Sequence, residues 1–280
     1  MKLSYNTGYL SGKKRKGFNK LIYKLFDYWN MCSIARQAIN KDIIEFIPSI
    51  HGDIVEIGGN RSLQNPHSSG KYILLEIEDS PNNDITANAE SLPFLSSSVH
   101  GFICLSVLEH TLNPNAVIDE IWRCLTPGGK AFISVPWLFE THMGPKDYYR
   151  FSSFLLNQLF KKFKIIKLEP TNSYIGLLAH FFQKQILTRY LIGTWLLLLD
   201  ELLKPNFTWT TQINAFIEKP MDTYNENNLN LDRWPNNIRC PLCAPLGKGR
   251  LSRDDPWFKC NDCDRVYSTI GKRIIFYKPN

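Results

Sequence analysis

The centre of the chain decides the fold. From Asp84 to Pro136 it reads DITANAESLPFLSSSVHGFICLSVLEHTLNPNAVIDEIWRCLTPGGKAFISVP. Two apolar runs in it, GFICLSV and KAFISVP, predict buried strands. Between them AVIDEIWRCL has apolar residues at the spacing of an amphipathic helix, and TPGG then breaks the chain. A strand, a helix and a second strand in this order predict a parallel sheet with helices on its faces.

The same alternation extends to both sides of this stretch. DIVEIG (53–58) and KYILLEIE (71–78) predict two earlier strands, and FKIIKLEP (163–170) predicts a later one. The first 45 residues or so have apolar residues at helical spacing, which predicts a helical N-terminal extension. These apolar residues are Leu21, Ile22, Leu25, Phe26 and Trp29. We therefore predict an α/β fold.

The loop after the first predicted strand contains adjacent glycines, Gly58 and Gly59. Ligands bind beyond the carboxyl ends of parallel strands, and glycines let the backbone approach a ligand closely. Near the end of the second strand, Glu76 offers two acceptor oxygens for the hydroxyls of a ribose, with Glu78 as the alternative. By itself, this loop is equally consistent with a tight turn.

Three further motifs give the sequence a more specific signature than the loop alone. They are A-x-x-L-P-F at Ala89–Phe94, L-E-H at Leu108–His110, and L-x-P-G-G at Leu125–Gly129. In order and spacing the segment from about Gly52 to Ser152 resembles the class I S-adenosylmethionine-dependent methyltransferases. The resemblance implies a seven-stranded Rossmann-like sheet and S-adenosylmethionine as the methyl donor.

The resemblance also implies a set of cofactor-binding residues. They are Glu56, Gly58, Gly59 and Asn60 in the loop at the methionine part, Glu76 at the ribose, Asn88 and Ala89 near the adenine, and Leu105 and Ser106 beside the methionine and sulfonium. The sequence departs from the family in its shortened glycine spacing and in Asn88, which replaces a common Asp. Val99 and His100 also replace the common Phe and Asp. An amide still bonds adenine, so we expect cofactor binding; a catalytically lapsed descendant is the alternative.

Two histidines are the candidate catalytic residues, because methyl transfer to a hydroxyl or amine needs placement and a base. His110 lies in the L-E-H motif, where packing and helix capping are its alternative roles. His142 begins HMGPKDYYRFS (142–152), which resembles a segment found in a subset of these enzymes that is often associated with sugar or cell-surface polymer pathways. Histidine titrates near neutral pH and can act as a base.

The same segment supplies the predicted substrate-binding residues Asp147, Tyr149 and Arg150. Asp147 and Arg150 either shape the loop as a pair or bind a polar substrate. In a purely structural alternative, Asp147 caps a helix that starts near Phe151, Arg150 pairs with Asp147, and the tyrosines pack.

Four cysteines near the C-terminus predict a structural zinc site. They form two C-x-x-C pairs, Cys240 with Cys243 and Cys260 with Cys263, separated by 16 residues. Such pairs, at this separation, supply four thiolates in a tetrahedron with no open position. Metal binding also supplies folding free energy that a segment of some forty residues lacks. Redox or disulfide chemistry is the alternative.

The surrounding residues, including Tyr267 and Gly271, resemble a short zinc-ribbon family whose members include a small methyltransferase-activator subunit. This resemblance implies docking on the catalytic domain in cis, or recruitment of a substrate or a protein partner. We therefore divide the chain into a helical extension (1–45), a methyltransferase domain (46–204), a linker or covering segment (205–237) and a zinc ribbon (238–280).

Residues 174–203, YIGLLAHFFQKQILTRYLIGTWLLLLDELL, raise the question of a membrane. Their longest uncharged piece, Tyr190–Leu199, is far shorter than the roughly 20 residues that span a bilayer. We predict buried helices and no transmembrane span. An interfacial helix in peripheral contact with a membrane, or an apolar wall of the substrate site, is the alternative.

Composition limits the remaining choices. Hydrophobic residues make up 44% of the 280, enough for a core, and the odd count of seven cysteines, with no apolar export signal, favours a reducing, cytoplasmic location. We predict an enzyme that methylates a small-molecule or glycan-linked acceptor. One alternative is a lapsed adaptor that binds a partner through the ribbon. The other is an RNA methyltransferase, which the net charge of +7 permits but the absence of an N/D-P-P-Y/F segment disfavours.

Overall fold

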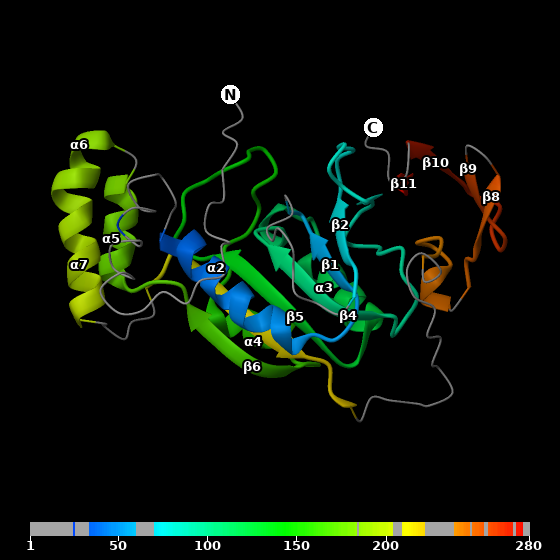
Figure 1. The fold of residues 1–280 in the computed structure, drawn as a ribbon, viewed down its shortest axis with the longest axis horizontal. Helices are drawn as coiled ribbons and strands as arrows, with labels where there is room; N and C mark the ends of the chain where they lie inside the picture. The colour runs from blue at the N-terminus through cyan, green and yellow to red at the C-terminus, as the bar shows by residue number, and fades with distance from the viewer. Residues whose placement is uncertain are drawn as a thin grey trace.

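The computed structural model describes residue 25 and residues 34–59, 70–183, 185–203, 209–221, 238–246, 248–254, 257–270 and 273–276 (Figure 1). The helices are α2 (Ile34–Phe46), α3 (Pro114–Cys124), α4 (Ser153–Leu159), α5 (Tyr174–Gln183), α6 (Ile186–Thr188) and α7 (Thr194–Leu203), with a π-helical turn at Arg189–Gly193 and short 3-10 turns at Ile47–Ser49, Leu108–His110 and Ala244–Leu246. The strands are β1 (Ile54–Ile57), β2 (Tyr72–Glu76), β3 (Ile85–Thr86), β4 (Val99–Leu105), β5 (Leu125–Pro136), β6 (Lys164–Pro170), β7 (Gln212–Glu218), β8 (Leu251–Asp254), β9 (Trp257–Cys260), β10 (Val266–Ile270) and β11 (Arg273–Ile275).

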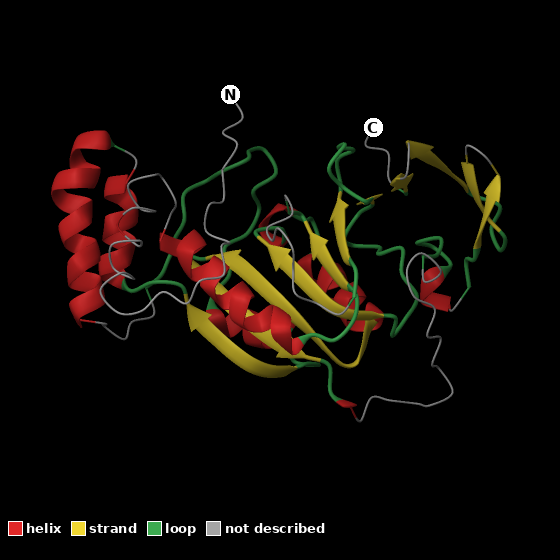
Figure 2. Cartoon of the chain, in the orientation of Figure 1, coloured by secondary structure: helices red, strands yellow, loops and turns green. Residues whose placement is uncertain are grey.

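These strands form one sheet in the order β6-β7-β5-β4-β1-β2-β3-β11-β10-β9-β8 (Figure 2). Strands β5, β4, β1, β2 and β3 pair in parallel, whereas β7 runs antiparallel to both β5 and β6. The first seven strands along the chain therefore make a mixed sheet with helices on both faces, and the predicted α/β, Rossmann-like, seven-stranded sheet is confirmed.

The core lies on both faces of this sheet because the strands are apolar throughout. Along β4, Phe102 and Cys104 point to the cluster that includes α3, whereas Ile103 and Leu105 point to the cluster that includes α2. Cys104 and Cys124 are both fully buried, as expected for packing, and burial raises the pKa of the Cys124 thiol to about 12. Continuous apolar runs are what a sheet covered on both faces requires.

Strand β7 was not predicted. It lies inside residues 205–237, which we interpreted as linker or covering, yet it runs between β5 and β6 and is buried along nearly its whole length. The neighbouring Asn-rich stretch, together with a single short apolar run, hid it. The sheet is consequently mixed rather than wholly parallel.

The TPGG segment does not end a structural element as expected. Residues 126–129 fall within β5, where the pairing with β4 shifts its register between Val99 and Gly101. Gly128 has φ of +75°, a conformation that glycine adopts without strain. The prolyl-glycyl stretch is thus an irregularity inside a long strand.

Helices α5 and α7 pack side by side at one end of the molecule, next to Leu25 (Figure 1). The prediction that 174–203 forms buried helices is wrong for the outer face, because many of its large apolar side chains are exposed. They are Leu178, Phe181, Leu187, Tyr190, Leu191, Ile192, Trp195, Leu199, Leu202 and Leu203. Apolar composition does not by itself distinguish a core from an exposed surface. Among the described residues, no helix is long and apolar enough to cross a membrane.

The N-terminal helical extension is described only at Leu25 and from Ile34 onward; α2 confirms its last part, and residues 1–24 and 26–33 lie outside the described residues. At the opposite end of the chain, the four C-terminal strands continue the central sheet. β11 pairs in parallel with β3, Phe276 N donates to Thr86 O at 2.7 Å, and Arg239 N donates to Pro93 O at 3.0 Å. The C-terminal segment therefore docks in cis on the edge of the sheet (Figure 2).

Candidate functional site

The residues predicted for the cofactor gather where the parallel strands end. Ile57 of β1 lies opposite both Leu75 of β2 and Cys104 of β4. On β3, Thr86 lies opposite Glu76. The predicted cofactor residues at or just after these strand ends are therefore neighbours at one edge of the sheet: Gly58, Glu76, Asn88 and Ser106. Ligands bind at this edge in such folds.

Both glycines of the loop after β1 are needed because neighbouring side chains lie close to their Cα atoms. Gly58 has φ of +71°, and a Cβ there would meet Val107 Cγ2 at 2.1 Å. A Cβ on Gly59 would meet a carboxylate oxygen of Glu56 at 1.8 Å. Glu56 is fully buried and accepts a 2.6 Å hydrogen bond from the Tyr72 hydroxyl, which holds it under the loop. Asn60, the next predicted residue, lies outside the described residues.

Glu76 and Asn88 lie on adjacent strand ends. Burial, followed by the charges of Glu56 and Glu78, raises the pKa of Glu76 to about 7. Ala87 N donates to Glu76 O at 2.9 Å, which brings the 87–89 turn against the end of β2. Asn88 Oδ1 accepts from Glu90 N at 2.9 Å, and Ala89 is buried. The side-chain oxygen of Asn88 thus stabilises its own turn.

Ser106 follows β4 with φ of +53°, a conformation rare for residues other than glycine. Its N–H donates to Ser134 O at 2.9 Å, and its Oγ lies 3.4 Å from Gln212 Nε2. Gln212 Oε1 in turn accepts from Ser134 Oγ at 3.3 Å. Gln212 was missed with the rest of β7. Leu105, the last residue of β4, is buried. Strained backbone of this kind is characteristic of ligand sites.

The two candidate catalytic histidines lie together. Their ring centroids are 4.8 Å apart, and Glu109 lies against both: Glu109 Oε1 is 3.9 Å from His110 Nε2 and 3.7 Å from His142 Nε2. Glu109 is fully buried, and burial raises the pKa of its carboxyl group to about 8. Glu109, the acid of the L-E-H motif, was not among the predicted site residues.

Asp147 and Arg150 pair within the loop that follows β5. Arg150 donates to both carboxylate oxygens of Asp147, at 2.6 and 2.8 Å, and its guanidinium also bonds the backbone oxygens of Phe139 and Glu140. The Arg150 guanidinium holds the pKa of Asp147 well below its usual range. Asp147 Oδ2 accepts from His142 N at 2.8 Å. The pair therefore shapes the loop around His142.

The capping role considered for Asp147 is wrong. The N-cap of α4 is Ser152, whose Oγ accepts from Leu155 N, because the helix begins at Ser153 rather than near Phe151. Tyr149 is about one-third exposed, and its hydroxyl donates to Leu112 O at 3.0 Å. The loop is thereby fastened to the turn that carries Glu109 and His110.

The L-P-F motif is fixed to α3 rather than to the cofactor edge. Leu92 N donates to Glu120 Oε2 at 2.7 Å, and Arg123 donates to the backbone oxygens of Leu92 and Phe94. Phe94 also forms an isolated antiparallel bridge with Ile238. The motif thus supports the segment on which the C-terminal residues dock.

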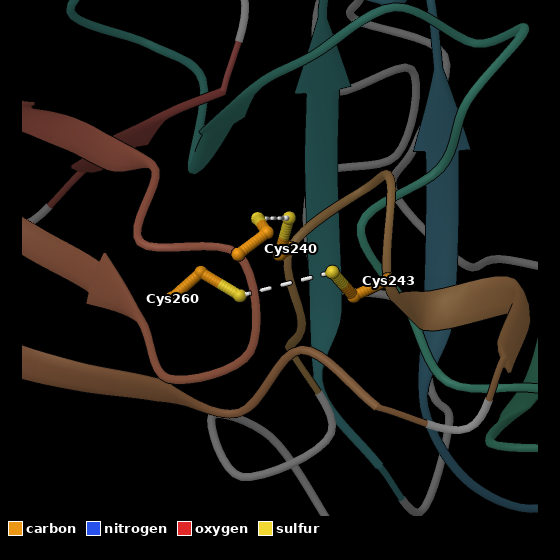
Figure 3. Close-up of side chains that lie close together, drawn as sticks. Cys240, Cys243 and Cys260 are labelled. Atoms are coloured by element: carbon orange, nitrogen blue, oxygen red, sulfur yellow. Dashed lines mark hydrogen bonds between the residues drawn. The ribbon is translucent and has the colours of Figure 1, made fainter.

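The four C-terminal cysteines converge, and Figure 3 shows Cys240, Cys243 and Cys260 pointing toward one another. Their sulfur atoms all lie within 4.8 Å of one another, with Cys240 Sγ 3.6 Å from Cys263 Sγ and Cys243 Sγ 3.9 Å from Cys260 Sγ. The Tyr267 hydroxyl lies 2.9 Å from Cys240 Sγ. In the tight turn, a Cβ on Gly249 would meet Cys243 Cβ at 2.8 Å, so only glycine fits there.

Comparison with known protein families finds a match in the central part of the chain. Residues 71–133 match the family described as "Methyltransferase domain". No curated protein matches the sequence. The match spans β2, β3, β4 and most of β5, so this part of the chain carries the sequence pattern of a methyltransferase domain.

Solved structures with a similar fold include a SAM-dependent methyltransferase from Archaeoglobus fulgidus, with 13% identity, a TM-score of 0.44, and coverage of 70% of this chain and 99% of that one. Haemonchus contortus phosphoethanolamine N-methyltransferase 2 has 13% identity, a TM-score of 0.45, and coverage of 70% and 56%. A complex of the Haloferax volcanii Trm112 methyltransferase activator with a methyltransferase has 16% identity, a TM-score of 0.46, and coverage of 64% and 87%. At these values the similarity concerns the fold alone.

Proposed function

We propose that this protein transfers the methyl group of S-adenosylmethionine to a small-molecule or glycan-linked acceptor, and that residues 238–280 form a structural zinc ribbon. The observation that carries the proposal is the junction at the end of β4. There the strained Ser106, at the cofactor edge, is followed within four residues by Glu109 and His110. A donor site and a set of polar, proton-accepting groups are thus adjacent.

The predicted cofactor residues keep their roles in this proposal. Gly58 and Gly59 let the loop pack closely against Val107 and Glu56 at the end of β1, where the methionine part is proposed to bind. Glu76 presents a half-buried carboxyl group suited to the two ribose hydroxyls, and Asn88 and Ala89 lie on the adjacent turn for the adenine. Leu105 and Ser106 line the end of β4 beside the methionine part. The sulfonium supplies an activated methyl group when it is bound.

His142 is the proposed general base, with His110 beside it. The side chain of His142 is 27% exposed, so an acceptor can reach it, whereas Glu109 behind it is buried. Asp147, Tyr149 and Arg150 are proposed to border the acceptor, with the Asp147–Arg150 pair fixing the loop that carries His142. Removing His142 should lower kcat more than it weakens cofactor binding.

The cysteine cluster fits zinc. A tetrahedral ion with metal–sulfur bonds of about 2.3 Å has sulfur atoms about 3.8 Å apart. The Cys240–Cys263 and Cys243–Cys260 sulfur separations are 3.6 and 3.9 Å. We therefore assign Cys240, Cys243, Cys260 and Cys263 as ligands of a structural Zn²⁺. The division of the chain at 45, 204 and 237 stays part of the proposal, with β7 counted in the catalytic sheet.

The ribbon is proposed to stabilise the catalytic domain in cis, because β11 extends the edge at β3 and Ile238 bridges Phe94. Contact with a protein partner would use the surface of the ribbon that faces away from β3. Peripheral contact with an anionic membrane is also proposed for the exposed apolar face of α5 and α7, since the net charge is +7. A cytoplasmic location is consistent with four cysteines that hold a metal as thiolates.

Isothermal titration with S-adenosylhomocysteine tests the proposal. Binding with one site per chain supports a working donor site, whereas a folded protein that produces no heat supports the lapsed adaptor. Transfer of a labelled methyl group to sugar-containing small molecules, rather than to RNA, then tests the acceptor class. A steep salt dependence of RNA affinity would favour the RNA methyltransferase instead.

A further inference from the structure

A second cluster of possible metal-binding side chains lies apart from the four cysteines. We infer that Glu109, His110 and His142 bind one divalent transition-metal ion through a carboxylate oxygen and two imidazole nitrogens. One ligand atom from each residue lies within 4.8 Å of the others, and these residues lie on two segments, the turn after β4 and the loop after β5. The inference concerns metal binding and holds whichever acceptor the enzyme uses.

The first argument is the buried carboxylate. Glu109 is 0% exposed, and neither of its side-chain oxygens has a hydrogen-bond partner among the described residues. Burying a carboxyl group without close partners is unfavourable, so such groups are normally paired or bound to a metal. The nearest side-chain nitrogens, those of His110 and His142, lie 3.9 and 3.7 Å away, beyond hydrogen-bonding range. A cation between the three groups would supply the missing partner.

The second argument is the orientation of the two rings. Nδ1 of His110 bonds the backbone oxygen of Lys146, and Nδ1 of His142 lies 3.2 Å from the backbone oxygen of Glu140. A carbonyl can only accept, so each Nδ1 carries a proton, and a neutral ring in this position has its lone pair on Nε2. Both Nε2 atoms face Glu109. A cation between the three groups would be held by both lone pairs and a carboxylate oxygen.

This arrangement is also how proteins orient metal-binding histidines. A ligating imidazole almost always donates its other N–H to a carbonyl or carboxylate, which fixes the tautomer and the ring. The loop that carries His142 is itself held by Asp147 and Arg150, and Tyr148 N donates to Glu109 O at 2.8 Å. The donor atoms are therefore held in place before any ion binds.

The spacing suits a first-row transition metal. Nitrogen and oxygen ligands about 2.1 Å from a tetrahedral ion lie about 3.4 Å apart. The distances from Glu109 Oε1 to His142 Nε2 and His110 Nε2, 3.7 and 3.9 Å, need to contract by only a few tenths of an ångström. Two imidazoles and one carboxylate favour Zn²⁺, Fe²⁺, Co²⁺ or Mn²⁺ over Mg²⁺ or Ca²⁺, which prefer oxygen ligands. Three protein ligands leave coordination positions for water or an acceptor oxygen.

A proton shared between Glu109 and the two histidines explains the cluster less well than a metal ion does. A single proton on Glu109 could serve only one histidine, and both separations are too long for a hydrogen bond. The ligand role also excludes the base role at the same Nε2 atom. Metal titration therefore decides which of the two roles the histidines have.

The experiment uses the full chain, loaded with zinc at the cysteine cluster, and Mn²⁺ as the probe. Mn²⁺ is a poor competitor for four thiolates, so its binding reports the Glu109–His110–His142 site. Electron paramagnetic resonance measures free Mn²⁺ during the titration. We expect one Mn²⁺ per chain, and affinity lower by about 10-fold or more in His142→Ala and in the near-isosteric Glu109→Gln. His51→Ala, an exposed histidine before β1, is the matched control and should bind as the wild type does.

Two results would overturn the inference: no Mn²⁺ or Co²⁺ bound by the wild type beyond the cysteine cluster, or equal affinity in wild type, His142→Ala and Glu109→Gln. S-adenosylhomocysteine affinity is measured on the same proteins. Unchanged cofactor binding in a variant that loses the metal shows that the variant is folded and supports the inference. Cofactor binding without any metal binding in the wild type rejects the metal site and leaves the methyltransferase function intact.

Discussion

The affinity of the protein for S-adenosylhomocysteine should rise with pH through neutrality, because of Glu76. Burial, then Glu56 and then Glu78, raises the pKa of Glu76 to about 7 in the ligand-free protein. The charged carboxylate is the form that accepts hydrogen bonds from both ribose hydroxyls. Below pH 7 the group is protonated, so the protein must release that proton when it binds the ligand.

The magnitude follows from this pKa. With a pKa of about 7, about one-tenth of Glu76 is ionised at pH 6 and about nine-tenths at pH 8. If only the ionised form binds the ribose tightly, Kd should fall about 10-fold between pH 6 and pH 8, which corresponds to about 1.4 kcal/mol. The sign is fixed: acid weakens binding and alkali strengthens it.

Isothermal titration at pH 6, 7 and 8 measures the effect. Glu76→Gln should bind more weakly at pH 8 and lose most of the pH dependence, since its amide does not titrate in this range. Glu78→Gln is the matched control: Glu78 is exposed and contributes only a minor part of the shift, so its variant should keep the pH dependence. A wild-type Kd that does not vary with pH, or an unchanged slope in Glu76→Gln, would refute the reasoning.

Three further predictions concern the loop, the ribbon and the exposed helices. Gly58→Ala should lower the free energy of unfolding by about 2–4 kcal/mol, because alanine is strained in the left-handed conformation and its Cβ clashes with Val107. Adding Val107→Ala should recover only the part of the loss that is due to the clash. Urea denaturation measures both effects, and additive effects of the two changes would contradict the prediction. Cys260→Ser should lower bound zinc by one ion per chain and should expose residues 238–280 to protease, while the rest of the chain stays resistant. Metal analysis and limited proteolysis measure these two effects. Full zinc content in the variant would contradict the ligand assignment. Trp195→Ser should reduce co-sedimentation of the protein with anionic vesicles, because Trp195 is 67% exposed on α7. Equal co-sedimentation of the wild type and the variant would argue against membrane contact by this face.

Local patterns in the sequence were sufficient for the strands and the cysteine cluster. Runs such as DIVEIG and KYILLEIE have no polar alternation, so they fit only a sheet covered on both faces, and they became β1 and β2. C-x-x-C pairs form tight turns that bring their sulfur atoms together, so spacing alone predicted the convergence of Cys240 with Cys260. Secondary structure that depends on a few adjacent residues can be predicted from those residues.

The remaining features depended on residues far apart in the chain. Strand β7 is stabilised by pairing with β5 and β6, which its own short apolar run did not reveal, and Gln212 reaches Ser106 only through that pairing. Apolar periodicity predicted helices over 174–203 but not which face would stay exposed, because burial depends on what packs against a helix. The L-E-H motif contains Glu109, but only the tertiary structure brings His142 to it, from a loop more than thirty residues away. Local sequence determined the central parallel strands and the glycine loop. The geometry that joins Glu109, His110 and His142, like the position of β7, depends on non-local packing, which no short pattern records.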